Sequence, residues 1–341
     1  MSQDDLDFSS DTSAPAHPAV LDALARANHA MAASYGSDPL TAELQSLICE
    51  IIETDVAIFP VVSGTASNAL ALSLLANPME SILCHDEAHI ARDERGAPEF
   101  FSAGAKLSLL AGSDGKIAPE TLETACATIN RAFVHETPPA ALSLTNLTEC
   151  GTAYTPDEIR TLCDIAKRHD LATHLDGARL ANALAHTGAS PADMTWRAGI
   201  DVLSLGLTKT GAMSCEIICL FGDLRDRLNE LRARAKRAGH MPPKMRFISA
   251  QGLALLSDGL WLELARNAND VAQALAGKLV ASGEAQIQYP VEGNEVFARL
   301  SDDLLTKLQA KGLKAYPWPG GATRFVCNWS LRAATFDRIK L

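Results

Sequence analysis

The sequence has no surplus of positive charge, and this lack excludes one class of protein. Its 341 residues include 30 Lys and Arg against 41 Asp and Glu, which gives a formal net charge of −11. A surface that binds duplex nucleic acid needs clustered cations, so we expect no nucleic-acid partner. The basic stretch from Arg225 to Arg237 is interrupted by Asp226 and Glu230 and is typical of a solvated helix face, with a phosphate or subunit contact as the alternative.

Long apolar runs are also missing. No run approaches the roughly 18 apolar residues of a membrane helix, so we expect no membrane partner. Residues 1–5 are acidic and contain no apolar core, which argues against a signal peptide. These two features together predict a cytoplasmic protein.

The eight cysteines have no metal-binding spacing. They are scattered along the chain without a Cys-x-x-Cys pair, and only Cys215 and Cys219 are close, beside and within an apolar run. We therefore expect no metal site. Reduced cysteines that act as small core residues are the better interpretation.

The chain does contain strand-like and helix-like segments in alternation, which is typical of βαβ units around a mostly parallel sheet. A composition of 47% hydrophobic and 21% charged residues is that of a globular protein. The length suits two domains. We expect a large α/β domain over residues 1–245 and a smaller α+β domain over residues 246–341, hinged on a long helical region from Met245 to Val280.

The hydrophobic patterns predict the following elements. Strands are expected at 56–62, 81–84, 106–110, 133–135, 142–145, 171–176, 201–206 and 217–221, and in the smaller domain at 295–300 and 323–329. Helices are expected at 65–75, 119–130, 159–169, 224–238 and 304–310. Thr155 and Glu158 have the spacing of a capping box at the start of the 159–169 helix.

Two charged residues follow buried strands of this predicted sheet. Asp176 closes the run that begins at Leu171, and Lys209 comes just after the run from Asp201 to Gly206. The carboxyl ends of parallel strands form the ligand crevice of such a sheet. Pyridoxal 5′-phosphate (PLP) needs a carboxylate that keeps its pyridine nitrogen protonated and a lysine that binds its aldehyde as a Schiff base. The pair therefore predicts PLP as the cofactor.

A candidate phosphate site lies between the first predicted strand and its helix. In Ser63-Gly64-Thr65, the glycine permits close backbone approach and the first N–H groups of the helix are free to hold a phosphate. Alone, such a turn is most often only a capped helix. With Asp176 and Lys209 in the same chain, we interpret it as the phosphate site, to which Ser204 and Thr208 would add hydroxyl contacts.

Three histidines are candidates for ring stacking or proton transfer. His89 follows the strand that ends near Cys84, and we expect its imidazole to stack on the pyridine ring and to exchange protons. His85 is a competitor for that place. His135 follows an apolar segment and is a second candidate general base or water holder.

Two arginines suit the carboxylate of an amino-acid substrate, whose two oxygens match the guanidinium fork. Arg179 lies three residues beyond Asp176, close enough to face the same crevice, and is also a candidate cofactor-binding residue. Arg324 follows the flexible Gly320-Gly321 pair, and a small domain that closes on the substrate would carry it inward. The alternative for Arg324 is a charge on the surface of a strand.

Several segments resemble one known family. His174 to Arg179 matches the His-x-Asp-Gly-Ala-Arg signature of the L-threonine aldolases, and the resemblance covers nearly the whole chain. Gly206 to Gly211 is similar to the lysine segment of the branch that includes the low-specificity and phenylserine aldolases. The further matches are Phe8–Thr12, Tyr35–Pro39, Ser63–Thr65, Ala88–Ile90 and Thr148–Thr152.

The resemblance implies a fold-type-I PLP enzyme of the aspartate-aminotransferase superfamily. It implies a lyase that cleaves a β-hydroxy-α-amino acid (threonine, allo-threonine or phenylserine) to glycine and an aldehyde, with either threo or erythro selectivity. It also implies that Ser10 lies near the substrate, that the protein is a homodimer or homotetramer, and that Tyr35 reaches a neighbouring subunit's site. Ser9 and Leu207 depart from the arginine or asparagine and the glycine that we expect there, a change that bears on substrate preference.

Two alternatives share the same cofactor residues or the same fold. A β-eliminating lyase or an aminotransferase would use Asp176 and Lys209 in the same way. A non-catalytic protein with a PLP-enzyme fold is the alternative outside the enzymes, and the complete set of lysine, aspartate and phosphate turn argues against it.

Overall fold

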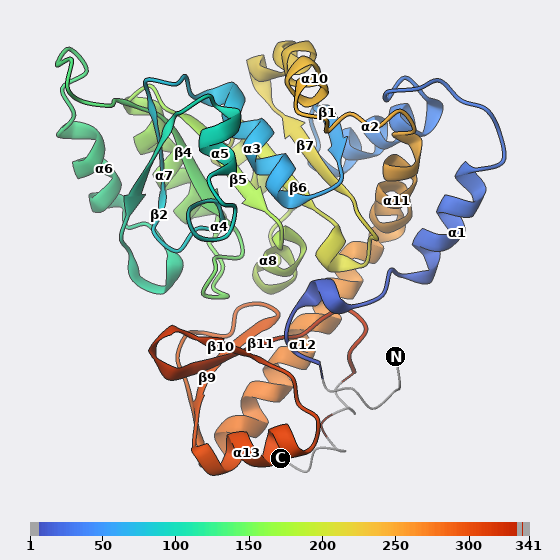
Figure 1. Cartoon of the computed structure of the whole chain (residues 1–341), viewed down its shortest axis with the longest axis vertical. Helices are drawn as coiled ribbons and strands as arrows, with labels where there is room; N and C mark the ends of the chain where they lie inside the picture. The colour runs from blue at the N-terminus through green and yellow to red at the C-terminus, as the bar shows by residue number, and fades with distance from the viewer. Residues whose placement is uncertain (1–6, 333–335, 337–341) are drawn as a thin grey trace.

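The chain folds around two β-sheets that are joined by one long helix, α12 (Leu260–Ala281) (Figure 1). The structure is a computed structural model and describes residues 7–332 and 336. The larger sheet, with its helices, forms the upper part of Figure 1, and the smaller sheet forms the lower part. Within the described residues, no helix combines the length and the apolar character needed to cross a bilayer.

The larger sheet has seven strands in the order β1-β7-β6-β5-β4-β2-β3. The strands are β1 (Ala57–Val61), β2 (Ser81–His85), β3 (Lys106–Leu110), β4 (Pro139–Thr145), β5 (Ala172–Gly177), β6 (Val202–Gly206) and β7 (Glu216–Leu220). Strands β3, β2, β4, β5 and β6 pair in parallel, and β7 runs antiparallel between β6 and β1. The predicted mostly parallel sheet is confirmed.

Both faces of this sheet are covered, which explains why its strands read as continuous apolar runs. On β7, Ile218 and Leu220 pack with α3 and α10, whereas Ile217 and Cys219 pack into the core on the opposite face. The helices of this part are α1 (Pro18–Ala27), α2 (Pro39–Ile52), α3 (Gly64–Leu75), α4 (His89–Arg92), α5 (Ala97–Phe101), α6 (Pro119–Ala127), α7 (Pro156–Arg168), α8 (Leu180–Thr187), α9 (Pro191–Met194), α10 (Leu228–Arg237) and α11 (Arg246–Leu256).

Local sequence signals account for where several of these helices begin. Helix α7 starts with the predicted capping box, in which Thr155 and Glu158 satisfy each other's backbone N–H groups. Helix α3 starts at Ser63, whose hydroxyl accepts a hydrogen bond from the Ala66 N–H at 3.3 Å.

The smaller sheet is antiparallel and has the order β10-β11-β9-β8. Its elements are β8 (Ala285–Ile287), β9 (Glu295–Leu300), α13 (Asp302–Ala310), β10 (Tyr316–Trp318) and β11 (Ala322–Val326). Its core includes Phe325 and residues of α12, together with Phe8 from the start of the chain. The Phe8 N–H also donates to the Lys314 carbonyl oxygen, and the Phe8 carbonyl oxygen accepts from the Val326 N–H, both at 2.8 Å.

These contacts bear on the domain division. Helix α11, which the sequence places in the smaller domain, packs against α1 and α2 of the larger part. The amino-terminal segment, which the sequence places in the larger domain, contributes Phe8 to the smaller core. We therefore propose a boundary within α12 rather than at residue 245, with Phe8 belonging to the smaller unit.

Two predicted elements differ from the structure. Phe133 to His135 lie in an exposed turn before β4 and form no strand. The helical region from Met245 to Val280 is interrupted at residues 257–259, because Asp258 and Gly259 have left-handed backbone angles (φ 54° and 71°) that a continuous α-helix does not allow.

Candidate active site

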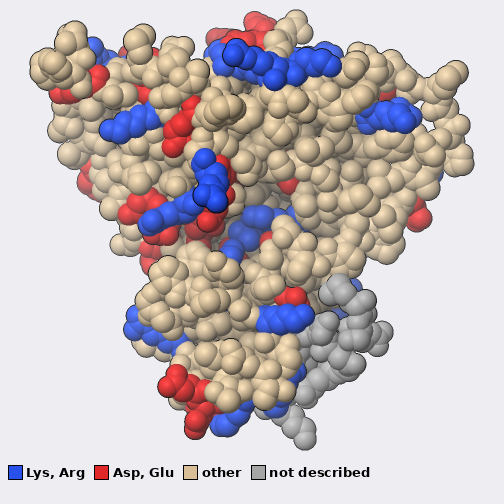
Figure 2. All heavy atoms as spheres, in the orientation of Figure 1, with Lys and Arg blue, Asp and Glu red and all other residues tan. Residues whose placement is uncertain are grey.

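A cavity of about 250 Å³ opens at the carboxyl ends of β5 and β6. Figure 2 shows that the molecule is hollowed between its larger and smaller parts, with Lys or Arg side chains inside the hollow. The cavity is lined by Thr12, Val62, Ser63, Gly64, Thr65, Asn68, His89, Glu94, Glu149, Asp176, Ala178, Thr208, Lys209, Met213, Ser214 and Glu216.

Seven residues that the sequence singled out separately meet in this cavity: Ser63, Gly64, Thr65, His89, Asp176, Thr208 and Lys209. The sheet topology brings them together. Asp176 lies near the end of β5, Lys209 lies in the short turn after β6, and Ser63 follows β1. The carboxyl ends of these three strands lie on the same edge of the sheet, so residues from distant parts of the sequence face one space.

Asp176 is buried and its carboxylate is held by two donors. The backbone N–H of Ala178 donates to Oδ1 at 3.0 Å, and the side-chain amide of Asn68, on α3, donates to Oδ2 at 2.7 Å. These two hydrogen bonds hold the Asp176 carboxyl group in a fixed position in the cavity.

His89 is connected to Asp176 through two further side chains. Its Nδ1 lies 2.8 Å from Glu94 Oε1, and the same oxygen accepts a hydrogen bond from the Asn68 amide at 2.9 Å. Burial acts to lower the pKa of His89, but the hydrogen bond to Glu94 and the nearby Glu149 and Asp176 raise the pKa overall. Burial also raises the pKa of Glu94, although its hydrogen bonds oppose this effect.

Lys209 has no ion pair and no hydrogen bond within the described part of the chain. Burial raises the pKa values of Glu149 and Glu216, and the charge of Lys209 opposes this effect; the same charge also helps to lower the pKa of Asp11. An amine without a fixed partner inside a cavity is free to bind a ligand.

The Ser63–Thr65 turn faces open space. A Cβ atom built on Gly64 would have no neighbouring heavy atom within 4 Å, so the turn presents its backbone to the cavity. Thr208 lines the same cavity, and its hydroxyl accepts a hydrogen bond from the Cys215 N–H at 3.1 Å. Backbone N–H groups at the start of α3 are therefore available to an anion.

Ser204 lies outside this lining. Its hydroxyl lies 3.0 Å from His174 Nε2 inside the sheet, and its side chain is buried. The Ser204 hydroxyl is thus hydrogen-bonded to a histidine of the neighbouring strand β5, and it is not part of the lining that contains the Ser63–Thr65 turn.

The two predicted substrate arginines are held by buried carboxylates and do not line the cavity. Arg179 Nε donates to Asp11 Oδ2 at 2.7 Å, and its Nη1 lies 3.3 Å from Glu295 Oε2. Arg324 donates to Glu295 Oε1 from Nε at 2.8 Å and from Nη2 at 2.6 Å. We call these four residues the arginine cluster. Burial acts to raise the pKa of Asp11, but Arg179 and Lys209 lower it overall to about 2.

Three further predicted residues lie elsewhere. His135 is exposed in the turn before β4, where its ring contacts that of Phe133 at 4.8 Å. His85 lies outside the cavity lining, with its Nε2 at 3.2 Å from the carbonyl oxygen of Gly112. Ser10 caps the short turn of residues 11–13 by accepting a hydrogen bond from the Thr12 N–H at 3.2 Å. The structure therefore separates His135 from the residues that it was expected to serve.

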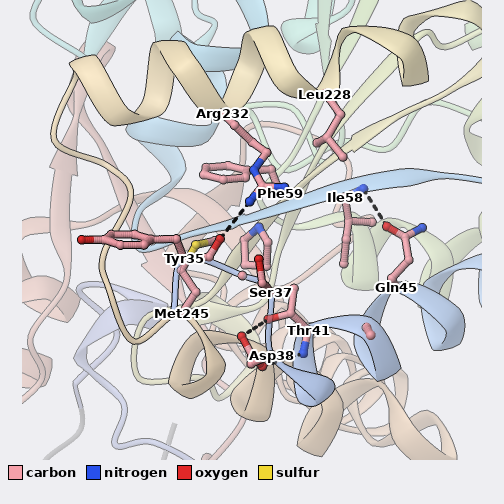
Figure 3. A pocket seen from close by; sticks show the side chains of 13 residues that line it. Tyr35, Ser37, Asp38, Thr41, Gln45, Ile58, Phe59, Leu228, Arg232 and Met245 are labelled. Atoms are coloured by element: carbon pink, nitrogen blue, oxygen red, sulfur yellow. Dashed lines mark hydrogen bonds between the residues drawn. The ribbon is translucent and has the colours of Figure 1, made fainter. Parts of the chain in front are cut away.

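Tyr35 borders a different cavity, of about 270 Å³, between α2, β1 and α10 (Figure 3). Arg232 donates to its carbonyl oxygen at 3.1 Å, and Lys236 lies 4.2 Å from the centre of its ring. The Tyr35 ring points away from the middle of this cavity in Figure 3. Within this chain, Tyr35 thus lies away from the cavity of Asp176 and Lys209.

Sequence reasoning gave no site role to six polar residues of the cavity: Thr12, Asn68, Glu94, Glu149, Ser214 and Glu216. Two of them carry a signal in the sequence. Glu216 opens the apolar run that forms β7, and a carboxyl group in such a run is buried at a cost. Asn68 lies one turn after the Ser63–Thr65 turn, so it faces the same side of α3.

Metal ligation has no support in the described residues, where no group of three or more His, Cys, Asp or Glu side chains is arranged to hold an ion.

Comparisons with known proteins agree with this geometry. The family described as beta-eliminating lyase matches residues 7–303. The chain is 38% identical over 328 residues to a protein of Pseudomonas sp. (strain NCIMB 10558) named low specificity L-threonine aldolase, a match that covers 96% of this chain and 94% of the relative.

Solved structures extend the comparison to the fold. A threonine aldolase from Leishmania major superposes with a TM-score of 0.90 at 29% identity, covering 98% of this chain and 97% of that one. An aspartate aminotransferase variant from Thermus thermophilus has a TM-score of 0.71 at 14% identity and covers 98% of this chain and 94% of its own. The predicted fold-type-I architecture is confirmed. The chain therefore belongs to the beta-eliminating lyase family and, within it, to the L-threonine aldolases.

Proposed function

We propose that this protein is a PLP-dependent aldehyde-lyase that cleaves a β-hydroxy-α-amino acid of the threonine, allo-threonine or phenylserine type to glycine and an aldehyde. The observation that carries the proposal is the convergence of Asp176, Lys209 and the Ser63–Thr65 turn on one cavity. The resemblance to relatives named threonine aldolase over nearly the whole chain supports it.

The residues around the cavity fit PLP. Lys209 is an amine without a partner among the described residues, Asp176 is a carboxyl group held by two hydrogen bonds, and the Gly64 turn is open to a phosphate. Two buried atoms beside them, Asn68 Oδ1 and Glu94 Oε2, have no hydrogen-bond partner in the structure.

Each of these groups would have a distinct role toward the cofactor. Lys209 would bind the aldehyde carbon of the cofactor, and Asp176 would bind the pyridine nitrogen. The Ser63–Thr65 turn would hold the phosphate, and His89 would lie against the face of the ring. When bound, PLP supplies a protonated pyridine ring that accepts the electron pair released when a bond at the substrate's Cα breaks.

His89 is the base that the geometry favours for the substrate's β-hydroxyl group. Glu94 lies beside Nδ1, and an ionised Glu94 accepts a hydrogen bond from the Nδ1–H group, which leaves the lone pair on Nε2. His89 lines the cavity, whereas His135 does not. We therefore assign the proton transfer to His89, directly or through a water molecule that it holds.

We propose that Arg179 and Arg324 bind the substrate carboxylate. Arg179 directly follows Ala178, which lines the cavity, and Glu295 connects Arg179 to Arg324. Because the orientation of the Cα bonds decides which of them breaks, a fixed carboxylate contributes reaction specificity as well as affinity. Ser10 lies next to the ion-paired Asp11 and would border the same group.

The experiment is a substrate panel of L-threonine, L-allo-threonine and L-phenylserine, given to PLP-loaded protein without any keto acid. We expect equal amounts of glycine and aldehyde from at least one of the three. A β-eliminating lyase would release ammonia and a keto acid instead, and an aminotransferase would need a keto-acid acceptor. Either of those outcomes would overturn the proposal.

We also propose that the protein is a cytoplasmic homodimer or homotetramer. Seven of its eight cysteines are buried as free thiols, and Tyr35, which is 36% exposed, lies away from the site of its own chain. Both features fit a reducing compartment and a subunit interface near Tyr35. Light scattering on the purified protein gives the mass of the assembly.

A further inference from the structure

Glu216 is a buried carboxyl group that has no role in the mechanism above, and its position in the sheet is unusual. It is the first residue of β7, which lies between β1 and β6. Its register partners are Val61 on one side and Gly206 on the other. Val61 leads into the Ser63–Thr65 turn, and Gly206 leads into the turn that contains Lys209.

The Glu216 side chain faces the cavity between these two turns. It lines the cavity together with Ser63, Thr65, Thr208 and Lys209, yet the residue is only 7% exposed. The backbone N–H of Leu207 donates to Oε2 at 3.2 Å, and the Thr208 side chain contributes a second hydrogen bond. Within the described part of the chain, no cation forms an ion pair with it.

The charged groups that act on the pKa of Glu216 are Lys209 and Asp176, and the ionisable residues His89, Glu94 and Glu149 line the same cavity. Strands β1 and β6 and helix α3 carry no ionisable side chain other than weakly acidic hydroxyls, and the one basic residue of α11, Arg246, donates to the carbonyl oxygen of Ala27. Burial raises the pKa of Glu216 to about 7, and Lys209, Thr208 and Leu207 oppose the effect of burial.

We infer that Glu216 takes up one proton when the phosphate group of the cofactor binds at the Ser63–Thr65 turn, and that the neutral carboxyl group then faces the phosphate. This inference rests on the proposed PLP site. An ionised carboxylate beside a phosphate dianion in a small cavity would repel it, whereas a neutral carboxyl group is a hydrogen-bond donor. The proton comes from the solvent and forms a new O–H bond on the carboxylate, so charge and atoms balance.

The affinity for the phosphate then depends on pH, and the sign follows from linkage. The bound anion raises the pKa of Glu216 above its value of about 7 in the free protein, so binding is tightest where Glu216 is already neutral. At pH values above that pKa, Glu216 must gain a proton for the phosphate to bind. Affinity therefore falls by up to about tenfold for each further pH unit, in a range where the phosphate itself remains a dianion.

The test is calorimetric titration of the cofactor-free protein with pyridoxine 5′-phosphate at pH 8, in two buffers with different ionisation enthalpies. This probe has the phosphate but no aldehyde, so it forms no bond to Lys209. The difference between the buffers counts the protons taken up. With a pKa of about 7, roughly nine-tenths of Glu216 is ionised at pH 8. We expect the wild type to take up roughly 0.9 proton more than Glu216→Gln.

The variants isolate the group. Glutamine keeps the volume and the hydrogen bond from Leu207 but cannot gain a proton, so its affinity should stay nearly constant between pH 8 and 9 while the wild type weakens about tenfold. Glu149→Gln is the matched control, because Glu149 lines the same cavity and interacts with Lys209 and Arg179 but does not lie on β7 between the two turns. Glu149→Gln should take up as many protons on binding the probe as the wild type does. Equal proton uptake in the wild type and Glu216→Gln would overturn the inference.

A second measurement needs no variant. The infrared difference spectrum of the wild type, with and without the probe, should gain a carboxylic-acid carbonyl band and lose carboxylate absorbance. A spectrum without that gain contradicts the inference even if Glu216→Gln does not fold. If the protein binds the probe without proton uptake and still cleaves L-threonine, only this inference is wrong. If the protein binds no PLP at all, the proposed function is wrong.

Discussion

The active-site cavity and the arginine cluster lie next to each other, and both are rich in buried charge. In the arginine cluster, Arg179 and Arg324 are paired with Asp11 and Glu295 within 3.3 Å. In the cavity, Asp176 is held by neutral donors, and Lys209 and Glu216 have no ion-pair partner among the described residues. Buried charges normally carry their own partners, so the unpaired ones mark the place where a ligand completes the site.

The comparison predicts that removing a charge has a different effect on the protein in each of the two regions. Charges of the cavity should affect ligand binding and turnover with little effect on folding. Charges of the arginine cluster should affect folding as well as substrate binding. The following predictions test that division, from the largest expected effect to the smallest.

Lys209→Ala should abolish turnover and the visible absorbance of the lysine-bound coenzyme. Because Lys209 has no hydrogen bond or ion pair within the described residues and acts on the buried carboxyl groups only through its charge, the cofactor-free protein should lose much less free energy of unfolding than Arg179→Ala. Glycine release and urea denaturation measure the two effects. Normal rates in this variant would remove Lys209 from the mechanism.

Arg179→Ala should destabilise the protein by about 3–5 kcal/mol, because it leaves the buried carboxylates of Asp11 and Glu295 without their shared cation. Urea denaturation of the cofactor-free protein measures this. Arg197→Ala is the matched control at a pair whose arginine side chain is 38% exposed, and it should destabilise the protein far less, because water screens an exposed ion pair. Similar losses in both variants would contradict the division.

Glu94→Gln should lower kcat roughly a hundredfold, with a smaller effect on KM, because Glu94 acts through His89 rather than on the substrate. The hydrogen bond to Glu94 raises the pKa of His89, and the base must be unprotonated to act. The low-pH limb of the kcat profile should therefore move to lower pH in the variant. An unchanged limb would show that His89 is not the titrating base.

His135→Ala should change kcat and KM by less than about twofold, because its exposed side chain lies in the turn before β4 and does not line the cavity. The same assay applied to His89→Ala provides the contrast. A large loss in His135→Ala would mean that the turn of residues 133–135 reaches an active site, in this chain or in a neighbouring one.

Much of the fold followed from local patterns in the sequence. The strands that end at Asp176 and before Lys209 were predicted from apolar runs, because strands buried on both faces have no polar alternation. The start of α7 followed from its capping box. The break at Asp258 and Gly259 was missed, although the Asp-Gly pair is a turn signal in the sequence.

Site residues could be predicted from the sequence where the residue type alone indicates the role. They could not be predicted where the role depends on a contact between distant parts of the chain. Asp176, Lys209 and His89 were found by their type and their place after strands. The pairing of Arg179 with Asp11 joins residues 168 positions apart in the sequence, and nothing local to either residue signals it. The role of Asn68 likewise depends on the packing of α3 against β5.

The central claim is that Asp176 and Lys209 serve one coenzyme, and borohydride reduction of the PLP-loaded protein tests it most directly. Reduction fixes the coenzyme to the amine that holds it, and peptide mass spectrometry then identifies the residue. We expect one phosphopyridoxyl group per chain, on the peptide that contains Lys209, and a much weaker label when Asp176→Ala is loaded at the same PLP concentration. A label on another lysine, or equal labelling in the two proteins, would contradict the claim.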